Sequence, residues 1–265
     1  MLRTILLKFF FGEVKFYTFH LMRYVLVLLL AAACSPIYVP NTRNVPLFKE
    51  GGEFQGTIYG TSAGGEAQMG YAISDHIAVT GNYAFGSQKQ TNSGDGQEFT
   101  RKNSYAELGL GLYNVKRNLR VELFGGYGIG KGTTHDQYYF FGLNNDVVAT
   151  GKYNRIFIQP SVGSNSRKFN IAFTPRISLM KFTEFTTEDT NATVAKFSPP
   201  NKYQVLIEPA VTGKFHLTGN LHGVFQLGLT VPTNTDEIYY EYMPAQFAIG
   251  LQLDTGNRLR TRVYK

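Results

Sequence analysis

The residues best suited to chemistry in this chain are a histidine and an aspartate that stand side by side in "THDQYYFFGLNND". General-base catalysis needs a histidine that a carboxylate holds within reach of a substrate. Consecutive residues of an extended chain point in opposite directions, so His135 and Asp136 do not pair with each other. We expect no catalytic residue here. The adjoining aromatic run predicts membrane-interface residues or an extended strand, with a partner-binding patch as the alternative.

Cys34 is the only cysteine of the 265 residues, which excludes an internal disulfide and any zinc or redox site built on paired thiols. We expect no metal site and no cofactor. The residues before Cys34 read "MRYVLVLLLAAA": one arginine, an apolar run, then small residues. This layout is typical of a secretory signal and is too short to span a membrane as a helix.

"LAAAC" resembles the lipobox of bacterial lipoproteins, in which small residues before a cysteine permit cleavage and acyl chains are then placed on that cysteine. Ala31 stands where that motif most often has leucine. The resemblance implies a lipoprotein signal peptide over 22–33 and lipid attachment at Cys34. The alternative is a plain secretory signal cut near Ala33, with a free thiol left behind.

The segments on either side of this signal also suggest roles. Residues 1–21 have no place in such a signal, so we interpret them as a spurious extension, with translation starting at Met22. Residues 34–52 hold three prolines and show no hydrophobic periodicity, which predicts an extended tether between the lipid and the folded part.

The basic charge is concentrated at the ends of the chain. The net charge is +7, and removal of 1–33 would take away four of the 26 basic residues and one of the 19 acidic ones, leaving about +4. Four of the remaining positive charges, Arg258, Arg260, Arg262 and Lys265, lie in the basic tail 254–265. Nucleic acid is therefore not an expected partner.

Residues 53–253 alternate apolar and polar or small residues with a period of two. In "SYAELGLGLYNV", Leu108, Leu110 and Leu112 face one way while Glu107 and the glycines face the other. Such runs of about ten residues match tilted strands that cross a bilayer.

We count about ten such strands, joined alternately by short turns and by mostly longer connections. "TSAGG", the first connection of the longer set, is an exception. The pattern predicts an antiparallel transmembrane β-barrel with short periplasmic turns, longer extracellular loops and both chain ends on the periplasmic side. A lipid on Cys34 would then sit in the inner leaflet. A lipid-anchored soluble β-sandwich is the alternative, but its buried face should be bulkier.

Four prolines, Pro160, Pro175, Pro209 and Pro244, fall inside the proposed strands, where proline cannot donate a ladder hydrogen bond. Pro160 and Pro175 lie at similar distances from their shared turn. We therefore expect a bulged zone at one height of the barrel.

The inward face carries charges of both signs. We expect a lumen charge network of Glu107, Arg120, Glu122, Arg155, Arg176 and Glu208, with Glu66 and His222 on the same face. Charges in a narrow lumen must pair to offset their loss of hydration. This favours a closed, rigid barrel over a narrow channel or small-ligand site, since efficient pores have rings of one sign.

"ACSPIYVPNTRNVPLFKEGGEF" followed by "GYAISDHIAVTGNYAF" resembles the outer-membrane β-barrel lipoproteins of Bacteroidetes. The resemblance implies a lipid-anchored protein of the bacterial outer membrane and supplies no catalytic residues. We expect a non-enzymatic barrel that is structural, an accessory of a surface assembly, or a receptor. Its expected partners are outer-membrane lipid and another envelope protein. A narrow channel or small-ligand binder is the alternative, and a barrel-embedded hydrolase is the third hypothesis.

Overall fold

The computed structural model describes residues 36–91, 98–140, 143–166, 168–189, 195–197, 202–233 and 240–255. The proposed extension 1–21, the signal 22–33, the lipid site Cys34 and most of the basic tail lie outside these residues. The described part contains no helix long and apolar enough to span a membrane.

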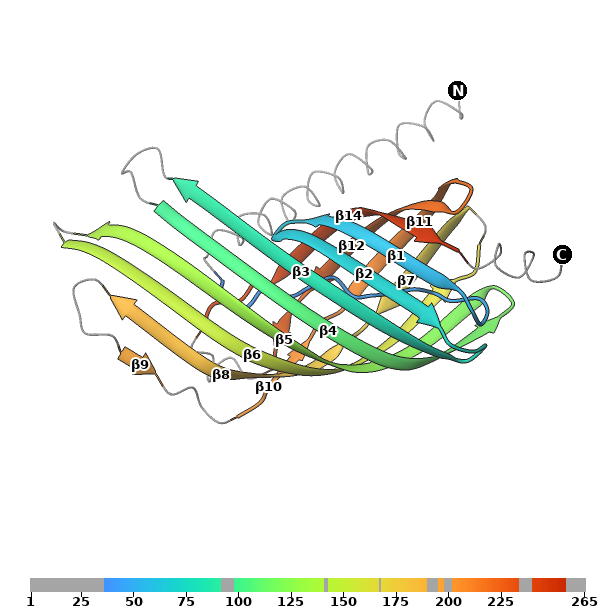
Figure 1. Cartoon of the computed structure of the whole chain (residues 1–265), viewed down its shortest axis with the longest axis horizontal. Coiled ribbons are helices and arrows are strands. Elements are labelled where there is room, and N and C mark those ends of the chain that lie inside the picture. The colour runs from blue at the N-terminus through green and yellow to red at the C-terminus, as the bar shows by residue number, and fades with distance from the viewer. Residues whose placement is uncertain are drawn as a thin grey trace, which may run out of the picture. The chain divides into compact units, whose positions relative to one another are not determined.

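The regular structure of the described residues consists of β-strands (Figure 1). In chain order they are β1 (Phe54–Thr61), β2 (Gly64–Ala72), β3 (Ile77–Thr91), β4 (Glu98–Lys116), β5 (Leu119–Phe140), β6 (Leu143–Ser164), β7 (Phe169–Thr174), β8 (Ile177–Asp189), β9 (Ala195–Phe197), β10 (Gln204–Ile207), β11 (Ala210–Thr218), β12 (Leu221–Leu229), β13 (Val231–Pro232) and β14 (Ala245–Asp254).

These strands close into an antiparallel barrel. β1 pairs with both β2 and β14, and β6 pairs with both β7 and β8. β7 continues as β8, β10 as β11, and β12 as β13, so each of these pairs makes one interrupted crossing. Counted in this way, the described residues form ten crossing strands, which confirms the predicted ten-stranded barrel.

The outer face of the barrel carries a band of apolar side chains. Leu108, Leu110 and Leu112 of β4 are 73%, 60% and 58% exposed, whereas Glu107 on the inner face is 3% exposed. The same alternation continues on the other strands. Exposing so much apolar area to water is unfavourable, and a closed barrel leaves no open sheet edge. This band is therefore the lipid-facing surface of a transmembrane barrel.

The two rims of the barrel differ. At one, the short-turn rim, the strands are joined by the links 73–76, 117–118, 165–168 and 219–220. At the other, the long-connection rim, three of the five links are longer. The turn at 62–63 is short, as the sequence predicts, and β5 and β6 are also separated by only two residues.

Much of what the sequence predicts as long loops is in fact strand. β5 and β6 each have 22 residues, whereas β1 and β2 have 8 and 9. Gly65 near the β1–β2 turn lies level with Phe85 of β3, and along the ladder with Lys131 of β5. The nine β5 residues beyond Lys131 extend the sheet by roughly 30 Å at about 3.3 Å per residue. We call this extension of β3–β6 and β8 the sheet wall, and residues 138–140 of the aromatic run belong to its β5 strand.

The predicted bulged zone is a zone of interrupted ladders instead: three of the prolines lie at one height, as predicted, but the register is the same on both sides of the break, so no residue is inserted as in a β-bulge. Pro175 falls in the break between β7 and β8, and Pro209 in the break between β10 and β11. Pro160 of β6 lies level with the first break, because the β6–β8 ladder ends at Ile158 and the β6–β7 ladder resumes at Val162. Pro244 differs from the prediction, since it precedes β14 instead of lying within a strand.

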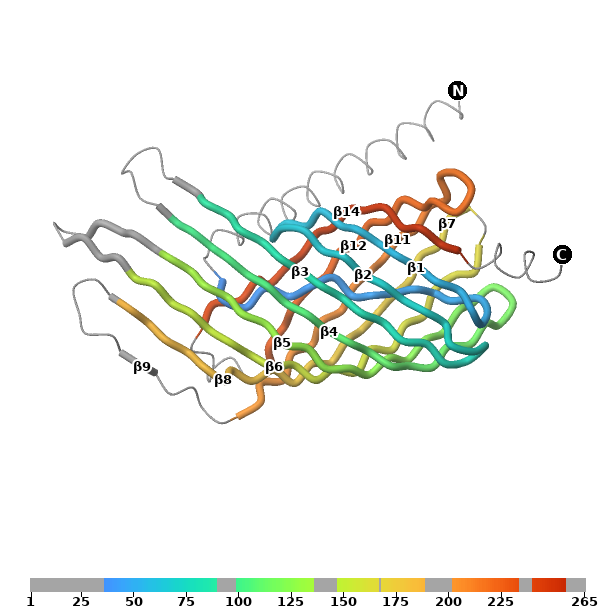
Figure 2. The backbone as a smooth tube through the Cα atoms, viewed as in Figure 1, coloured from blue at the N-terminus to red at the C-terminus, as the bar shows by residue number. Residues whose placement is uncertain are grey.

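The residues before β1 occupy the inside of the barrel. Every residue from Pro36 to Phe48 is buried, and the blue tube that precedes β1 in Figure 2 runs lengthwise through the barrel. We call Pro36–Phe48 the lumenal segment. It is extended, as the sequence predicts, but it fills the lumen and does not separate the barrel from an anchor.

Candidate functional site

The lumenal segment hydrogen-bonds to the barrel wall at several heights. At the long-connection rim, the backbone N–H of Ile37 donates to Glu241 O at 3.0 Å, and Tyr38 forms a parallel bridge with Tyr242. Further along, the backbone N–H of Thr42 donates to Glu66 Oε2 at 2.9 Å. At the other end, the N–H of Phe48 donates to Glu122 Oε1 at 3.0 Å.

Arg43 is the most heavily bonded side chain of the lumenal segment, and it is completely buried. Its guanidinium donates to the backbone oxygens of Asn41 at 3.0 Å and Leu229 at 2.8 Å, and to Gln246 Oε1 at 3.3 Å. Its backbone N–H donates to Gln226 Oε1 at 2.7 Å. The segment is thus bonded to β12 and β14 through both its side chain and its backbone.

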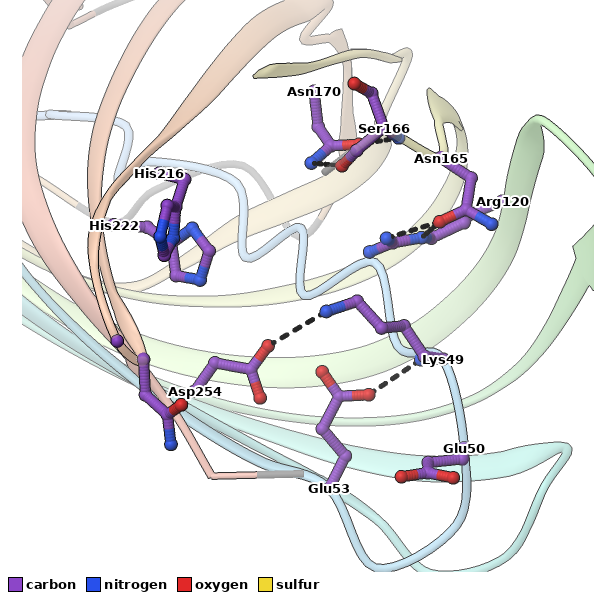
Figure 3. A pocket seen from close by; sticks show the side chains of 12 residues that line it. Lys49, Glu50, Glu53, Arg120, Asn165, Ser166, Asn170, His216, His222 and Asp254 are labelled. Atoms are coloured by element: carbon purple, nitrogen blue, oxygen red, sulfur yellow. Dashed lines mark hydrogen bonds and ion pairs between the residues drawn. The ribbon is translucent and has the colours of Figure 1, made fainter. Parts of the chain in front are cut away.

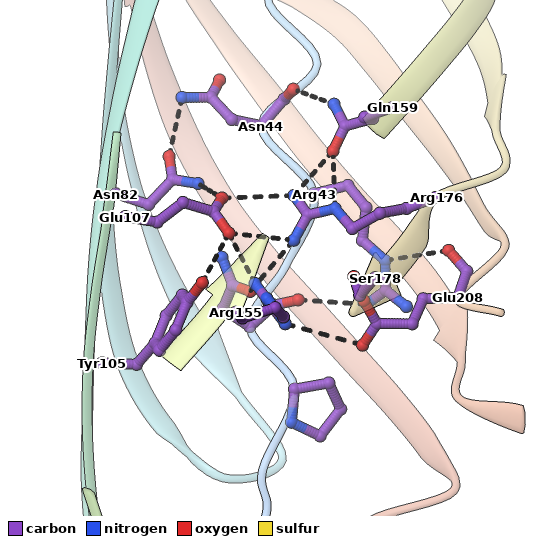
Figure 4. A network of polar contacts seen from close by, with 12 residues as sticks. Arg43, Asn44, Asn82, Tyr105, Glu107, Arg155, Gln159, Arg176, Ser178 and Glu208 are labelled. Carbon is purple, nitrogen blue, oxygen red and sulfur yellow. Dashed lines mark hydrogen bonds and ion pairs between the residues drawn. The ribbon is translucent and has the colours of Figure 1, made fainter. Parts of the chain in front are cut away.

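Buried charges of the wall meet at mid-height (Figure 4). Arg155 pairs with Glu107 at 2.6 Å and with Glu208 at 3.6 Å, and Arg176 pairs with Glu107 at 3.3 Å. All four side chains are at most 2% exposed. Arg176 and Glu208 come from the two strand breaks, and their backbones exchange hydrogen bonds at 2.7 and 3.2 Å. The interrupted zone therefore places charges in the lumen.

The lumenal segment completes this charge cluster. Tyr38 Oη donates to Glu208 Oε1 at 3.0 Å and accepts from Arg155 Nη1 at 2.7 Å. Asn41 Oδ1 accepts from Arg155 and Arg176. Buried ions are tolerated only when their hydrogen bonds are supplied by the protein, and here the segment supplies several of them.

The other two residues of the predicted network lie nearer the short-turn rim. Arg120 donates to Leu47 O at 2.5 Å and to Asn165 Oδ1 at 2.6 Å, while Glu122 accepts from Phe48 as described. Lys214 of β11 donates to Pro46 O at 2.9 Å. The six charges predicted to form one network thus form two groups, and the lumenal segment contacts both.

The long-connection end of the lumen is filled by aromatic rings. Tyr38 packs edge-on against Tyr153 at a centroid distance of 5.2 Å, and Phe182 packs against Tyr240 at 4.7 Å. Arg155 stacks over the ring of Tyr105 at 4.4 Å. This buried cluster lies on the long-connection side of the charge cluster and narrows the path through the barrel.

Glycines of the wall make room for the lumenal segment. A Cβ on Gly163 of β6 would lie 2.7 Å from Leu47 Cδ2, and a Cβ on Gly132 of β5 would collide with the backbone oxygen of Ile37. Real Cβ atoms are not found at such distances. The wall is therefore shaped around the segment at both ends.

A cavity of about 420 Å³ opens at the short-turn rim (Figure 3). Lys49 and Asp254 form an ion pair across it at 3.4 Å, and Glu53 Oε2 accepts from the N–H of Lys49 at 2.7 Å. Burial and the nearby Asp254 carboxylate raise the pKa of Glu53 to about 7. The rings of His216 and His222 lie 5.4 Å apart on paired strands. Among the described residues, no group of three or more acidic, histidine or cysteine side chains is placed to hold a metal ion.

His135 and Asp136 are consecutive residues of β5 in the sheet wall. His135 lies opposite Thr100 and Val148, and Asp136 lies opposite Phe99 and Val147. Both positions therefore belong to a paired strand and not to a loop.

Three lumen residues lie outside the network that the sequence predicts: Arg43, Tyr38 and Lys214. One signal in the sequence was available for the first two, because six of the thirteen residues of the lumenal segment are large and apolar, a content unusual for a solvated linker. Lys214 offers a weaker one, since it falls on the inward phase of β11.

No protein-family model matches the chain, and no curated protein matches it in sequence. The outer membrane protease OmpT from Escherichia coli is similar with a TM-score of 0.48 and 11% identity, over 81% of this chain and 100% of that one. The translocator domain of the autotransporter NalP from Neisseria meningitidis has a TM-score of 0.48 and 8% identity, over 91% and 97%. The beta domain of the Bordetella autotransporter Brka has a TM-score of 0.42 and 10% identity, over 77% and 99%.

Closure, the apolar outer band and the two unlike rims define the class of protein. The chain forms an outer-membrane β-barrel, and the lumenal segment fills its lumen.

Proposed function

We propose that this protein is a closed, non-conducting outer-membrane barrel, lipid-anchored at Cys34, that acts at the cell surface as an assembly accessory or receptor. The observation that carries the proposal is the lumenal segment, which is buried along its whole length and is hydrogen-bonded to the wall from rim to rim.

Ions pass through a barrel only along a continuous path of water. In this lumen the charged side chains are bonded to other protein groups. Arg155, Glu107 and Glu208 pair with one another and with the segment. Opening such a path would leave buried ions without partners. The mixture of signs also differs from the single-sign rings that select and conduct ions.

The sheet wall supports a role at the surface. It extends far beyond the level of the β1–β2 turn on one side of the barrel only, and its strands are hydrogen-bonded along their length. A paired, asymmetric sheet outside the bilayer is a rigid surface on which another envelope protein can dock.

Planar-bilayer recording tests the closed state. The purified full-length protein is expected to give no steady single-channel steps. A variant that lacks residues 36–48, with folding checked by heat-modifiable gel mobility, is expected to conduct. Steady steps from the unaltered protein would refute the closed barrel and favour the narrow channel.

Mass spectrometry of the mature N-terminus tests the lipid. We expect a chain that begins at Cys34 and carries the mass of acyl chains, and a Cys34→Ser chain without that mass. An unmodified Cys34 in the membrane fraction would refute the anchor and leave the barrel proposal standing.

A further inference from the structure

The lumenal segment has a direction, which its end contacts define. Ile37 and Tyr38 are bonded to the strand-free residues before β14: the N–H of Tyr38 donates to Glu241 O at 3.1 Å, and the N–H of Met243 donates to Tyr38 O at 3.0 Å. β14 starts at the long-connection rim, because its other end pairs with the start of β1. The segment therefore begins at the long-connection rim.

The opposite end of the segment lies at the short-turn rim. The ring of Phe48 packs against Tyr113 at 5.5 Å, and Tyr113 Oη donates to Ser74 O at 2.7 Å in the 73–76 turn. Lys49 then pairs with Asp254 at the end of β14. After Phe48 the chain turns within a few residues and enters β1, which runs back toward the long-connection rim.

In outer-membrane barrels the short turns face the periplasm and the long connections face the cell exterior. In this barrel the sheet wall extends from the long-connection rim, so that rim carries the larger structure outside the band of apolar side chains. The rim at which Pro36 lies is accordingly the cell-surface rim.

We infer that the chain enters the barrel from the cell-surface side, so that the residues before Pro36 are presented outside the cell and the barrel displays its own N-terminus. Cys34 precedes Pro36 by two residues, which span at most about 7 Å. The twelve residues from Ile37 to Phe48 would span roughly 40 Å in extended form. Residues 34 and 35 are too few to return to the periplasmic rim.

The surface exit rests on the contacts of the lumenal segment alone. The leaflet in which the lipid lies rests in addition on the proposed function, which places a lipid on Cys34. A lipid there would insert into the outer leaflet beside the cell-surface rim. The sequence led us to expect the inner leaflet, on the assumption that both chain ends lie on the periplasmic side.

The topology is held in place by the contacts of the segment. Withdrawal of the segment into the periplasm would break the bonds of Arg43 to β12 and β14 and the bonds of Tyr38 to the charge cluster. It would also empty the spaces that Gly132 and Gly163 leave in the wall.

Cysteine labelling on intact cells tests the inference. Full-length chains carrying Ser35→Cys, Ser62→Cys or Asn118→Cys are treated with a membrane-impermeant maleimide-polyethylene glycol. Ser62 lies exposed in the 62–63 turn, and Asn118 lies exposed in the 117–118 turn at the other rim. A parallel Cys34→Ser background keeps the native thiol out of the readout.

Ser35→Cys is expected to label on intact cells to the same extent as Ser62→Cys. Asn118→Cys is expected to label only after the cells are permeabilised. Labelling of Ser35→Cys only after permeabilisation would overturn the surface exit. Labelling of Asn118→Cys and not Ser62→Cys on intact cells would overturn the assigned orientation.

The mass of the mature N-terminus separates the two proposals. A surface-labelled Ser35→Cys chain with no acyl mass on Cys34 would keep the surface exit and reject the lipid anchor. An acylated chain whose Ser35→Cys thiol labels only after permeabilisation would keep the lipid anchor and reject the surface exit. Heat-modifiable gel mobility of each variant confirms that the barrel has folded.

Discussion

Replacement of Glu107 by glutamine tests the energetics of the lumen. Glu107 pairs with Arg155 at 2.6 Å and with Arg176 at 3.3 Å, and all three side chains are at most 2% exposed. The glutamine keeps the size of the side chain and removes its charge, so two buried guanidinium groups retain one nearby carboxylate, that of Glu208. Breaking a buried ion pair by removing one partner costs about 3–5 kcal/mol.

The chain offers a matched surface pair. Lys152 and Glu184 form an ion pair at 2.7 Å, with side chains 51% and 62% exposed. Such pairs contribute about 0–1 kcal/mol. We expect Glu184→Gln to leave the unfolding midpoint nearly unchanged, while Glu107→Gln lowers it strongly. Glu107→Gln combined with Arg155→Met should recover part of the loss, because no lone ion is left in that pair.

The assay is urea unfolding of the refolded barrel in lipid vesicles. The chain contains no tryptophan, so far-ultraviolet circular dichroism and heat-modifiable gel mobility follow the transition. A Glu107→Gln variant as stable as Glu184→Gln would refute the view that the charge cluster is buried and dry.

Three further outcomes are expected. Gly163→Val should lower the unfolding free energy by about 1–3 kcal/mol through overpacking against Leu47. Gly125→Val should cost much less, because Gly125 faces outward and the added Cβ would lie 3.7 Å from Phe157 O. Urea midpoints compare the two variants, and equal losses would contradict the fit. Because the pKa of Glu53 is raised to about 7, the folded state holds more protons than the unfolded state between about pH 4.5 and 7. The free energy of unfolding should therefore fall as pH rises through that window. A Glu53→Gln variant whose urea midpoint changes with pH in the same way would contradict this. Tyr38→Phe should loosen the cluster by removing the hydroxyl that joins Arg155 to Glu208, and should raise backbone hydrogen exchange near residue 38; unchanged exchange would argue against that bridge.

The barrel itself could be predicted from the sequence because its signal is local. Lipid outside and protein inside impose a period of two on each strand, so Leu108 and Glu107 can be assigned to opposite faces without knowledge of their neighbours. The turn lengths then order the strands. The common height of Pro160 and Pro175 could also be predicted, since they are equally far from one turn, but the sequence did not distinguish a β-bulge from the break in the ladders that the structure has.

The partners of the lumen charges could not be predicted in the same way. Which inward residue meets which depends on the curvature and stagger of the closed barrel, and two of the partners, Tyr38 and Asn41, lie outside any strand. The lumenal segment has no periodicity because it is surrounded on all sides. Its prolines suit both a solvated tether and a buried extended chain, and closure of the barrel decides between them.

The sheet wall was hidden for a related reason. In the sheet wall, strand residues such as Thr133 and Thr150 are polar, and their hydroxyls lie 3.2 Å apart across the ladder, so their sequence resembles that of a loop. Hydrogen bonding to adjacent strands, which is a non-local property, keeps the chain extended there.

The contacts of the lumenal segment fall on both sides of the place where the cylinder closes. Thr42 is bonded to Glu66 of β2, and Arg43 is bonded to Gln246 of β14, while β1 lies between these two strands. One short peptide thus links the first and last parts of the wall from within. These contacts bridge the β1–β14 seam, so separating β1 from β14 at that seam would also require the segment to give up its bonds to Glu66 or to Gln246.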